Sequence, residues 1–329
     1  MSARTYTLIH FIGTLLLVFV IAPEASAQSR LKVSHQWAES DLRHQMFLEF
    51  EKRVTAKLGN ALQFQAYPAG SLIKPRQQWE ALRRGRIDLS IFSLVYASGK
   101  VPALDIVLMP GLIRNTSVGM SWRTKPIGEK IEQILEQNDI KLLVWWWGNG
   151  GIGSTKKPVK LPKDVKGLQF RAAGSVFEHM LLEAGASITS MSSTEIYYAL
   201  STGVLDSCMT TSTSLVSYRL YEKLKFVNLP KNYSIFHTLT PLLMSKQAWE
   251  SLSSQQQAAL EKVAEDMYVD WIPAAFDRST EDVIRSFSRP GIEIHYMNES
   301  EFVKWRNFAI GTAWERFKTT APEGEELLE

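Results

Sequence analysis

The chain has 329 residues, of which 45% are hydrophobic and 22% are charged, an ordinary composition for a folded globular protein. Its length exceeds the usual size of a single domain, so we expect two lobes. The formal charge of +3 is spread along the chain without a tract of lysine or arginine, and this pattern argues against a nucleic-acid-binding protein.

The N-terminus has the pattern of a signal peptide. Arg4 is followed by an apolar run over 8–22, and Ala25-Ser26-Ala27 gives the small-x-small cleavage site. We therefore expect residues 1–27 to be removed after Ala27, leaving a periplasmic protein that starts at Gln28. The alternative is an uncleaved membrane anchor, but the run is short for a membrane span and the cleavage site follows it.

Strand and helix patterns alternate in the first part of the mature chain. The apolar spacing predicts, in order, strand 31–35, helix 46–58, strand 62–67, helix 75–84 and strand 87–91. This order favours a doubly wound α/β lobe. The frame Leu-x-x-Gly-x-x-Asp at 82–88 returns at 200–206. The repeat suggests a second lobe of related architecture, although so short a match also arises by chance.

The middle of the chain contains a glycine-rich segment after an apolar strand. We expect a connecting loop over 100–115, a helix over 118–137 and a strand over 141–147. Residues 148–153 then match the letters G-x-G-x-x-G of a dinucleotide-binding turn. The last glycine of such a turn must open a helix, and Ser-Thr-Lys-Lys-Pro is a poor helix start. We therefore interpret the segment as a hinge or as a place where the backbone approaches a ligand closely.

The stretch 162–206 organises the second lobe. Gly167 predicts a turn into a short strand, and Arg171 stands at the carboxyl end of that strand, where ligands bind in open α/β sheets. A capping box at 192–195 starts a helix that ends at Gly203, and another strand follows. This order predicts a parallel α/β lobe.

Two blocks within this stretch resemble the signature of a known family. DVKGLQFRAAG at 164–174 and EIYYALSTGVLD at 195–206 are similar to the solute-binding subunits of tripartite ATP-independent periplasmic (TRAP) transporters. Weaker similarity runs from 31 to about 266. The resemblance implies an α/β, two-lobed periplasmic binding protein with a ligand cleft between its lobes. It also implies a small organic acid as ligand and the membrane permease subunits of a TRAP transporter as partner.

A long helical pattern over 255–287 contains Pro273. Proline removes a backbone donor, so we expect a lobe-spanning helix that is kinked or divided. We assign the mature chain to an N-terminal lobe of 28–149 and 239–278 and a C-terminal lobe of 150–238 and 279–329. The polar tail 321–329 is expected to be frayed, and the protein is expected to be a monomer.

Arg171 is the first candidate for ligand contact. A guanidinium is always charged and grips a carboxylate through two parallel hydrogen bonds, and burying it without an anionic partner is unfavourable. The alternative is a surface arginine paired with a nearby acid. The resemblance favours ligand contact, because the carboxylate-clamping arginine of the family occupies this place in the Gly-x-x-x-Arg turn.

Further candidates occupy positions that match ligand-contacting places of the family: Gln36, Trp37, Ser93, Tyr96, Ser193, Thr210 and Phe236. For each of these, packing or capping is an equally good interpretation. Many members also carry a second arginine in the hinge segment, where this chain has Asn149 followed by glycine. We therefore expect Asn149 and the neighbouring Trp147 to contact the ligand, with Trp147 against an apolar part, unless the tryptophan is core. A monocarboxylate is then favoured over a compact dicarboxylate.

No catalytic or metal-binding constellation is visible in the sequence. The single cysteine, Cys208, excludes an internal disulfide, the histidines are not spaced as a metal pair, and no G-x-S-x-G motif occurs. We therefore expect a binding protein with no metal, no cofactor and no enzymatic activity. The alternative is an exported α/β enzyme acting on a nucleotide or carboxylate, supported only by the glycine-rich segment. A sensor without a transport role is also compatible with the sequence.

Overall fold

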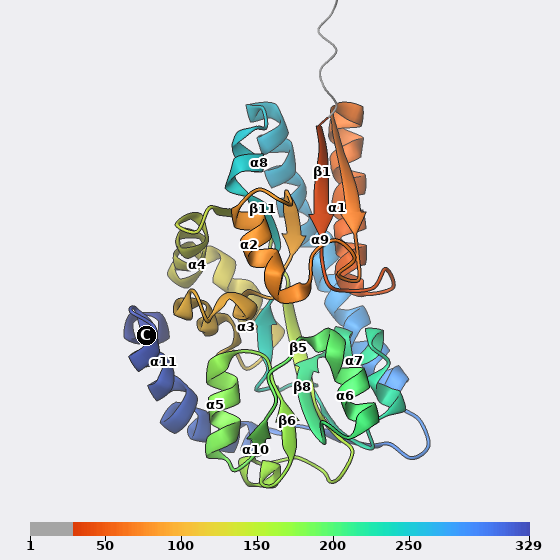
Figure 1. Ribbon diagram of the computed structural model, residues 1–329, viewed down its shortest axis with the longest axis vertical. Coiled ribbons are helices and arrows are strands. Elements are labelled where there is room, and N and C mark those ends of the chain that lie inside the picture. The colour runs from red at the N-terminus through yellow and green to blue at the C-terminus, as the bar shows by residue number, and fades with distance from the viewer. Residues whose placement is uncertain (1–28) are drawn as a thin grey trace, which may run out of the picture.

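The computed structural model describes residues 29–329, so the predicted signal peptide and its cleavage site lie outside the described residues. Two sheets lie one above the other along the long axis, each flanked by helices (Figure 1). The predicted two-lobed α/β architecture is therefore confirmed. Within 29–329, no helix is both long enough and apolar enough to cross a membrane.

The first sheet has the strand order β2-β1-β3-β11-β4. Its strands are β1 (Ser29–Ser34), β2 (Leu62–Tyr67), β3 (Leu89–Ile91), β4 (Ile140–Val144) and β11 (Leu242–Ser245). β1 runs parallel to β2 and β3, whereas β11 is antiparallel to both β3 and β4. A strand from late in the chain therefore lies between two strands from its first half.

The helices of the first lobe are α1 (Leu42–Leu58), α2 (Gln78–Arg83), α3 (Thr116–Ser121), α4 (Pro126–Glu136) and α8 (Lys246–Glu250). α1 begins earlier than predicted because the side chain of Asp41 caps it, accepting a hydrogen bond from the backbone N–H of Arg43. Its apolar face is buried against the sheet, and Gly59 ends it at a positive φ of 59°.

Two predicted segments of the first lobe were wrong in detail. The predicted helix 118–137 is split, because Pro126 has no N–H to continue a helix and instead starts α4 after the extended residue Lys125. The predicted loop 100–115 contains a 3-10 helix, Pro102–Leu108, most of which is buried.

The second sheet has the order β12-β9-β5-β8-β6-β7, with β10 paired to β5. Its strands are β5 (Trp147–Ser154), β6 (Gln169–Arg171), β7 (Ser187–Ile188), β8 (Ser207–Thr211), β9 (Phe226–Leu229), β10 (His237–Leu239) and β12 (Glu293–Tyr296). The helices α5 (Ser175–Glu183), α6 (Ile196–Thr202) and α7 (Ser212–Ser217) accompany it. The chain enters this sheet along β5 and leaves it along β10, which pairs antiparallel with β5.

The Leu-x-x-Gly-x-x-Asp frame forms the same turn in both lobes. Gly85 follows α2 and Gly203 follows α6, with positive φ angles of 63° and 76° that glycine adopts without steric penalty. Three residues later, Asp88 accepts a hydrogen bond from a backbone N–H of β1 at 2.7 Å, and Asp206 accepts one from β6 at 3.1 Å. The short repeat in the sequence therefore corresponds to a structural repeat.

One long helix, α9 (Ser254–Phe287), contacts both lobes. It packs against α1 and β4 of the first lobe and against α7 of the second. In Figure 1 it runs downward beside both sheets. The predicted lobe-spanning helix is therefore confirmed, and it is continuous through Pro273 rather than divided there.

The C-terminal helices are α10 (Glu299–Ala309), α11 (Glu315–Thr320) and α12 (Gly324–Leu328). The expectation of a frayed tail over 321–329 is wrong, because Ala321 and Leu327 are buried. α11 and α12 pack beside the 3-10 helix of the first lobe, and Lys130 of α4 forms an ion pair with Glu323 at 3.0 Å. The lobe boundaries given above stay a prediction.

Candidate functional site

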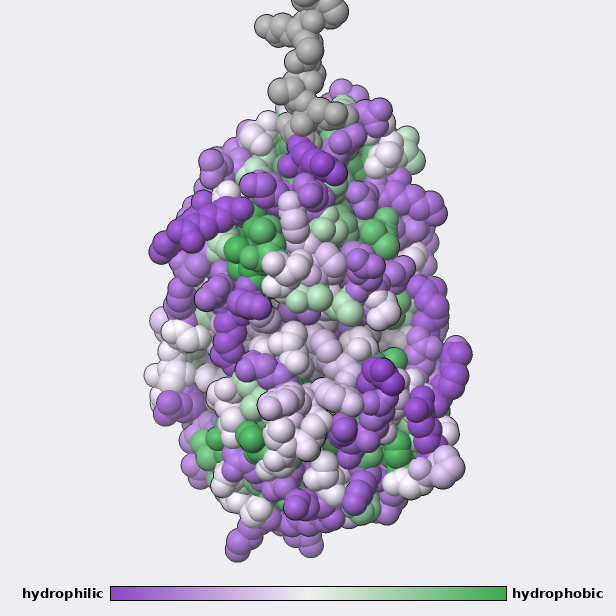
Figure 2. Space-filling view, turned by 45° about the vertical axis from the view of Figure 1, so that its right-hand side comes forward, coloured by the Kyte–Doolittle hydropathy of each residue, from purple (hydrophilic) through white to green (hydrophobic). Residues whose placement is uncertain are grey.

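A cavity lies between the two lobes, with about 290 Å³ of space between atoms, part of which is open to solvent. It is lined by Gln36, Trp37, Arg43, Ser93, Tyr96, Arg171, Ala173, Ser193, Thr210, Thr211, Ser214, Phe236, Thr238 and Thr240. Eight of the ten predicted contact residues belong to this lining, and Trp147 and Asn149 do not. Figure 2 shows residues of intermediate hydropathy gathered across the middle of one face, between the more hydrophilic ends of the molecule.

Arg171 ends β6 and is buried, with only 1% of its surface exposed. Its Nε donates to the carbonyl of Met191 at 3.1 Å, its Nη1 to the carbonyl of Met209 at 3.0 Å, and its Nη2 to the hydroxyl of Tyr96 at 3.1 Å. Among residues 29–329 no carboxylate forms an ion pair with it. Because a guanidinium has five N–H groups, a buried and unpaired charge remains here with donors to spare.

Tyr96 links the Arg171 charge to the opposite lobe. Its hydroxyl accepts hydrogen bonds from Arg171 and from the backbone N–H of Ser193 at 3.0 Å. Burial alone would raise the pKa of the Tyr96 phenol, but the Arg171 charge and the hydrogen bonds from Ser193 and Gln36 lower it overall. A hydroxyl that already accepts these bonds can donate its own proton to a carboxylate oxygen.

A second arginine, Arg43, faces the same cavity and was missed by the sequence analysis. It forms a buried ion pair with Asp41 at 2.7 Å and lies over the ring of Trp37, 4.0 Å from its centroid. Burial alone would raise the pKa of Asp41, but the Arg43 guanidinium holds it below its ordinary value. The charge of Arg43 is therefore balanced within the protein. The one feature of the sequence that could have drawn attention to Arg43 is Asp41, two residues earlier, which is a suitable helix-capping residue.

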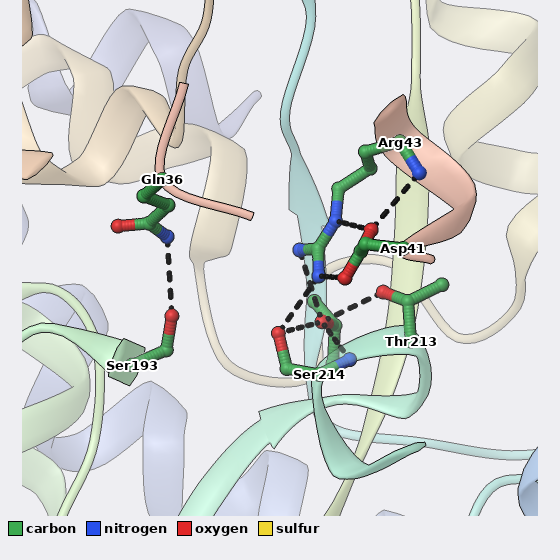
Figure 3. Close-up of polar contacts among 7 residues, drawn as sticks. Gln36, Asp41, Arg43, Ser193, Thr213 and Ser214 are labelled. Carbon is green, nitrogen blue, oxygen red and sulfur yellow. Dashed lines mark hydrogen bonds and ion pairs between the residues drawn. The ribbon is translucent and has the colours of Figure 1, made fainter. Parts of the chain in front are cut away.

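Direct hydrogen bonds join the two lobes at this cavity (Figure 3). Arg43 donates to the hydroxyl of Ser214 at 2.9 Å and to that of Thr211 at 3.3 Å. The side-chain amide of Gln36 donates to the hydroxyl of Ser193 at 3.1 Å. Residues from α1 and from the segment after β1 thus contact residues from β8, from α7 and from the segment before α6, so the lobes are closed on one another.

Several polar atoms of the lining have no protein partner. Among the described residues, Gln36 Oε1, Trp37 Nε1 and Thr238 Oγ1 are buried without a hydrogen bond. Buried polar groups are normally satisfied, so orphaned groups in one cavity indicate a polar ligand or bound water. Trp37 Nε1 and Thr238 Oγ1, together with Arg171, can donate to a ligand from both lobes, whereas Gln36 Oε1 can only accept.

Trp147 and Asn149 lie away from the cavity, although both were expected to contact the ligand. Trp147 is fully buried and packs edge-on against Trp122, with ring centroids 5.2 Å apart. Asn149 accepts a hydrogen bond from Ser212 at 2.8 Å, and its backbone pairs with β10. Both residues lie outside the lining of this cavity, and their contact with the ligand stays a prediction.

The glycine-rich segment 148–153 lies within β5 and does not open a helix. A Cβ on Gly150 would collide with the carbonyl of Thr210 on β8, and one on Gly151 with the carbonyl of Asn228 on β9. These glycines are required because neighbouring strands pass close to β5. The segment therefore lacks the strand–turn–helix context of a dinucleotide site.

Asp105 is a buried acid near the ligand cavity. It lies in the 3-10 helix of the first lobe, and its Oδ2 accepts a hydrogen bond from Ser175 at 2.5 Å. Its Oδ1 is buried without a partner. Burial raises the pKa of Asp105 to about 6, because no cation lies close enough to compensate.

The histidines and the cysteine do not form a reactive site. His35 and His44 contact each other through ring nitrogens 2.9 Å apart, which their spacing did not predict. Burial, and next the neighbouring His44, lower the pKa of His35 to about 3. Cys208 is buried, and burial raises the pKa of its thiol to about 12. Within the described range, no group of three or more His, Cys, Asp or Glu side chains could hold a metal ion.

Known solute-binding proteins are similar to this chain. A solute-binding protein of Albidiferax ferrireducens is 34% identical over 294 residues, which cover 88% of this chain and 87% of the relative. The 2,3-diketo-L-gulonate-binding periplasmic protein YiaO of Escherichia coli is 24% identical, covering 81% and 80%. A TRAP periplasmic solute-binding protein of Rhodoferax ferrireducens, solved with bound malonate, is 33% identical with a TM-score of 0.86, covering 91% and 96%.

A more distant structure has the same fold. A TRAP solute-binding protein of Chromohalobacter salexigens, solved with bound D-glucuronate, has a TM-score of 0.79 at 21% identity, covering 91% of this chain and 97% of the other. The family model for bacterial extracellular solute-binding proteins, family 7, matches residues 33–320. The chain therefore belongs to family 7 of the bacterial extracellular solute-binding proteins, the solute-binding proteins of TRAP transporters.

Proposed function

We propose that this protein captures a compact organic acid in the cavity between its lobes and delivers it to a TRAP-type membrane permease. It acts as a monomer in the periplasm after cleavage behind Ala27, and it binds its ligand without converting it. The observation that carries this proposal is Arg171, a buried guanidinium without a carboxylate partner among residues 29–329. An anionic ligand would supply the missing charge.

The cavity favours a small ligand with more than one polar group. Its space is small, about 290 Å³ even with the part open to solvent included, and its lining consists mainly of hydroxyls, an amide and two arginines. The unpartnered Trp37 Nε1 and Thr238 Oγ1 could donate to a second group of the ligand. The Rhodoferax protein was solved with malonate, which fits this description. We therefore replace the monocarboxylate expected from the sequence with a compact dicarboxylate.

Ligand binding and lobe closure are coupled in this arrangement. Arg171 and Tyr96 come from different lobes, and so do Gln36 and Ser193. A carboxylate bound to Arg171 could also contact donors of the first lobe, so it would bind the closed state more tightly than an open one. That difference in affinity is what shifts the population toward closure.

The enzyme alternative has lost its support. Its basis was the glycine-rich segment, and that segment is an internal strand whose glycines accommodate β8 and β9. A nucleotide site has no other observation in its favour, so we retain the binding function alone.

Isothermal titration of the mature chain, 28–329, against malonate, succinate, hexanoate and glucuronate tests the proposal. We expect malonate or succinate to bind, and we expect Arg171→Ala to abolish that binding while the protein stays folded. A ligand present at 100 times its dissociation constant should add about 2.7 kcal/mol to the free energy of unfolding. If no carboxylate binds the wild type, or if the variant binds as tightly, the proposal is wrong.

A further inference from the structure

A second, narrower cavity lies beside the ligand cavity, with about 200 Å³ of space between atoms, part of which is open to solvent. It is lined by Gly150, Gly151, Ile152, Asn228, Leu229, Pro230, Tyr233, Ser234, Ile235, Phe236 and Met297. Of the residues that the structure describes, Phe236 alone belongs to the linings of both cavities. Its side chain therefore stands between them.

The ring of Phe236 occupies the space that a side chain on Gly150 would need. A Cβ on Gly150 would lie 2.5 Å from Cδ1 of Phe236, and the backbone N–H of Gly150 donates to the carbonyl of Phe236 at 2.9 Å. Ser234 fixes the same turn, because its hydroxyl donates to the carbonyl of Gly150 at 2.7 Å and accepts from the N–H of Phe236 at 3.0 Å. The backbone is held in place, so the aromatic ring itself determines whether the cavities connect.

The second cavity differs chemically from the first. The first contains two arginines, whereas the second has no charged side chain in its lining and is formed mainly by aliphatic and aromatic groups. Its one unsatisfied polar atom is Asn228 Oδ1, which is buried without a donor within 29–329. A charged group would lose its hydration there without gaining a partner, whereas an uncharged tail would not.

We propose that Phe236 is the residue that limits ligand size, and that the cavity behind it is an unused subsite for the uncharged tail of an organic acid. This inference rests on the proposed function, because the acid head must first bind at Arg171. Shortening the side chain should join the cavities, since large-to-small substitutions in a packed interior leave space that the surroundings only partly fill. A tail entering that space would gain affinity by burying apolar surface.

The test uses malonate and its 2-alkyl derivatives with methyl, ethyl, butyl and benzyl tails, titrated into wild type, Phe236→Ala and Phe236→Leu. In the wild type we expect affinity to fall as the tail lengthens. In Phe236→Ala we expect it to rise by up to about fourfold for each methylene that is buried. Phe236→Leu should be intermediate, and it serves as the readout if the alanine variant fails to fold.

Met297→Ala is the matched control, because Met297 lines the second cavity but not the first. It enlarges the second cavity and leaves the partition intact, so the wild-type order of affinities should persist. Adipate, which would place a second charge in the tail cavity, should gain nothing in any variant. The inference is overturned if both Phe236 variants still bind the alkyl malonates in the wild-type order of affinity. It is also overturned if Met297→Ala gains as much affinity for the longer tails as Phe236→Ala does. Failure of malonate and succinate to bind the wild type instead overturns the proposed function.

Discussion

Arg43 and Arg171 line the same cavity, yet among residues 29–329 only Arg43 has an acidic partner. Arg43 is held by Asp41 in a buried ion pair, whereas Arg171 donates only to two carbonyls and a phenol. A buried charge that is paired within the fold is already compensated. A buried charge without a partner is unfavourable, and binding of an external anion would compensate it. The comparison assigns a structural and lobe-bridging role to the first arginine and a ligand-binding role to the second.

Asp41→Ala should have the largest effect on folding, because it leaves the Arg43 charge buried and unpaired. We expect the free energy of unfolding, measured by urea denaturation, to fall by about 3–5 kcal/mol. The double variant Asp41→Ala/Arg43→Met removes both charges and should recover much of this loss. A single variant that loses less than about 1 kcal/mol would contradict the structural role of the pair.

Arg171→Met should behave in the opposite way to Asp41→Ala: it should lose ligand affinity and keep its stability. Loss of the carboxylate contact should weaken ligand binding by about 2–5 kcal/mol, on the order of thirtyfold to several thousandfold. The unliganded protein should be no less stable than the wild type, because an unpaired buried charge has been removed. Arg171→Lys keeps the charge but loses the planar fork and should bind with intermediate affinity. Destabilisation as large as that of Asp41→Ala would show that Arg171 is structural.

Asp105→Asn extends the comparison to the buried acids. The pKa of Asp105 in the folded protein is about 6 against an ordinary value of 3.8, so its charged form is disfavoured in the fold. Wild-type stability should therefore decrease as pH rises from about 4 to 6. A shift of about two pKa units predicts that Asp105→Asn gains roughly 2–3 kcal/mol at pH 8 and almost nothing at pH 4.

Asp41→Asn is the control for this pH dependence, because Arg43 shifts the pKa of Asp41 in the other direction. Its charged form stabilises the fold, so this variant should lose stability at pH 8, and the loss should shrink as the pH falls. Denaturation at several pH values should show that the stability of the variant relative to the wild type rises with pH for Asp105→Asn and falls with pH for Asp41→Asn. If the relative stabilities of both variants change in the same direction with pH, the two acids do not have opposite effects on stability.

Ser193→Ala should have the smallest effect. It removes the hydrogen bond from Gln36 that joins the lobes, and one such bond contributes about 0.5–1.5 kcal/mol. We expect ligand affinity to fall between about twofold and tenfold by calorimetry. Ser201→Ala is the control, because the hydroxyl of Ser201 bonds only to the carbonyl of Tyr197 within α6, away from the cavity. Equal losses in both variants would argue against a role for the Gln36–Ser193 bond in closure.

The sequence predicted those parts of the site that depend on local pattern. A strand end and a turn fix the place of Arg171, and Gln36 and Trp37 follow the first strand, but it was the resemblance to the TRAP family that marked these residues as ligand contacts. Arg43 could not be predicted, since its contacts with Thr211 and Ser214 depend on how the second lobe docks against the first. Trp147 lies outside the cavity lining for a similar reason: its position on β5 is local, but the direction of its ring is set by Trp122 and Gly119.

The fold was predictable to a similar extent. The alternation of strands and helices indicated two α/β lobes, and the repeated Leu-x-x-Gly-x-x-Asp frame marked equivalent turns. The tail was misjudged because it is rich in glutamate, an acidic residue that favours a solvated segment. However, Ala321, Gly324 and Leu327 recur every three residues and form the buried face of the last turns. Their burial depends on the 3-10 helix of the first lobe, which the sequence did not predict.

The position of β11 has a consequence for how the protein is made. In the first sheet β3 and β4 do not pair with each other, because β11, residues 242–245, lies between them (Figure 1). During synthesis from the N-terminus, this sheet stays incomplete until about three quarters of the chain has emerged. Domains fold as units once their sequence is available. The first lobe therefore completes its sheet late in synthesis, when residues 242–245 become available.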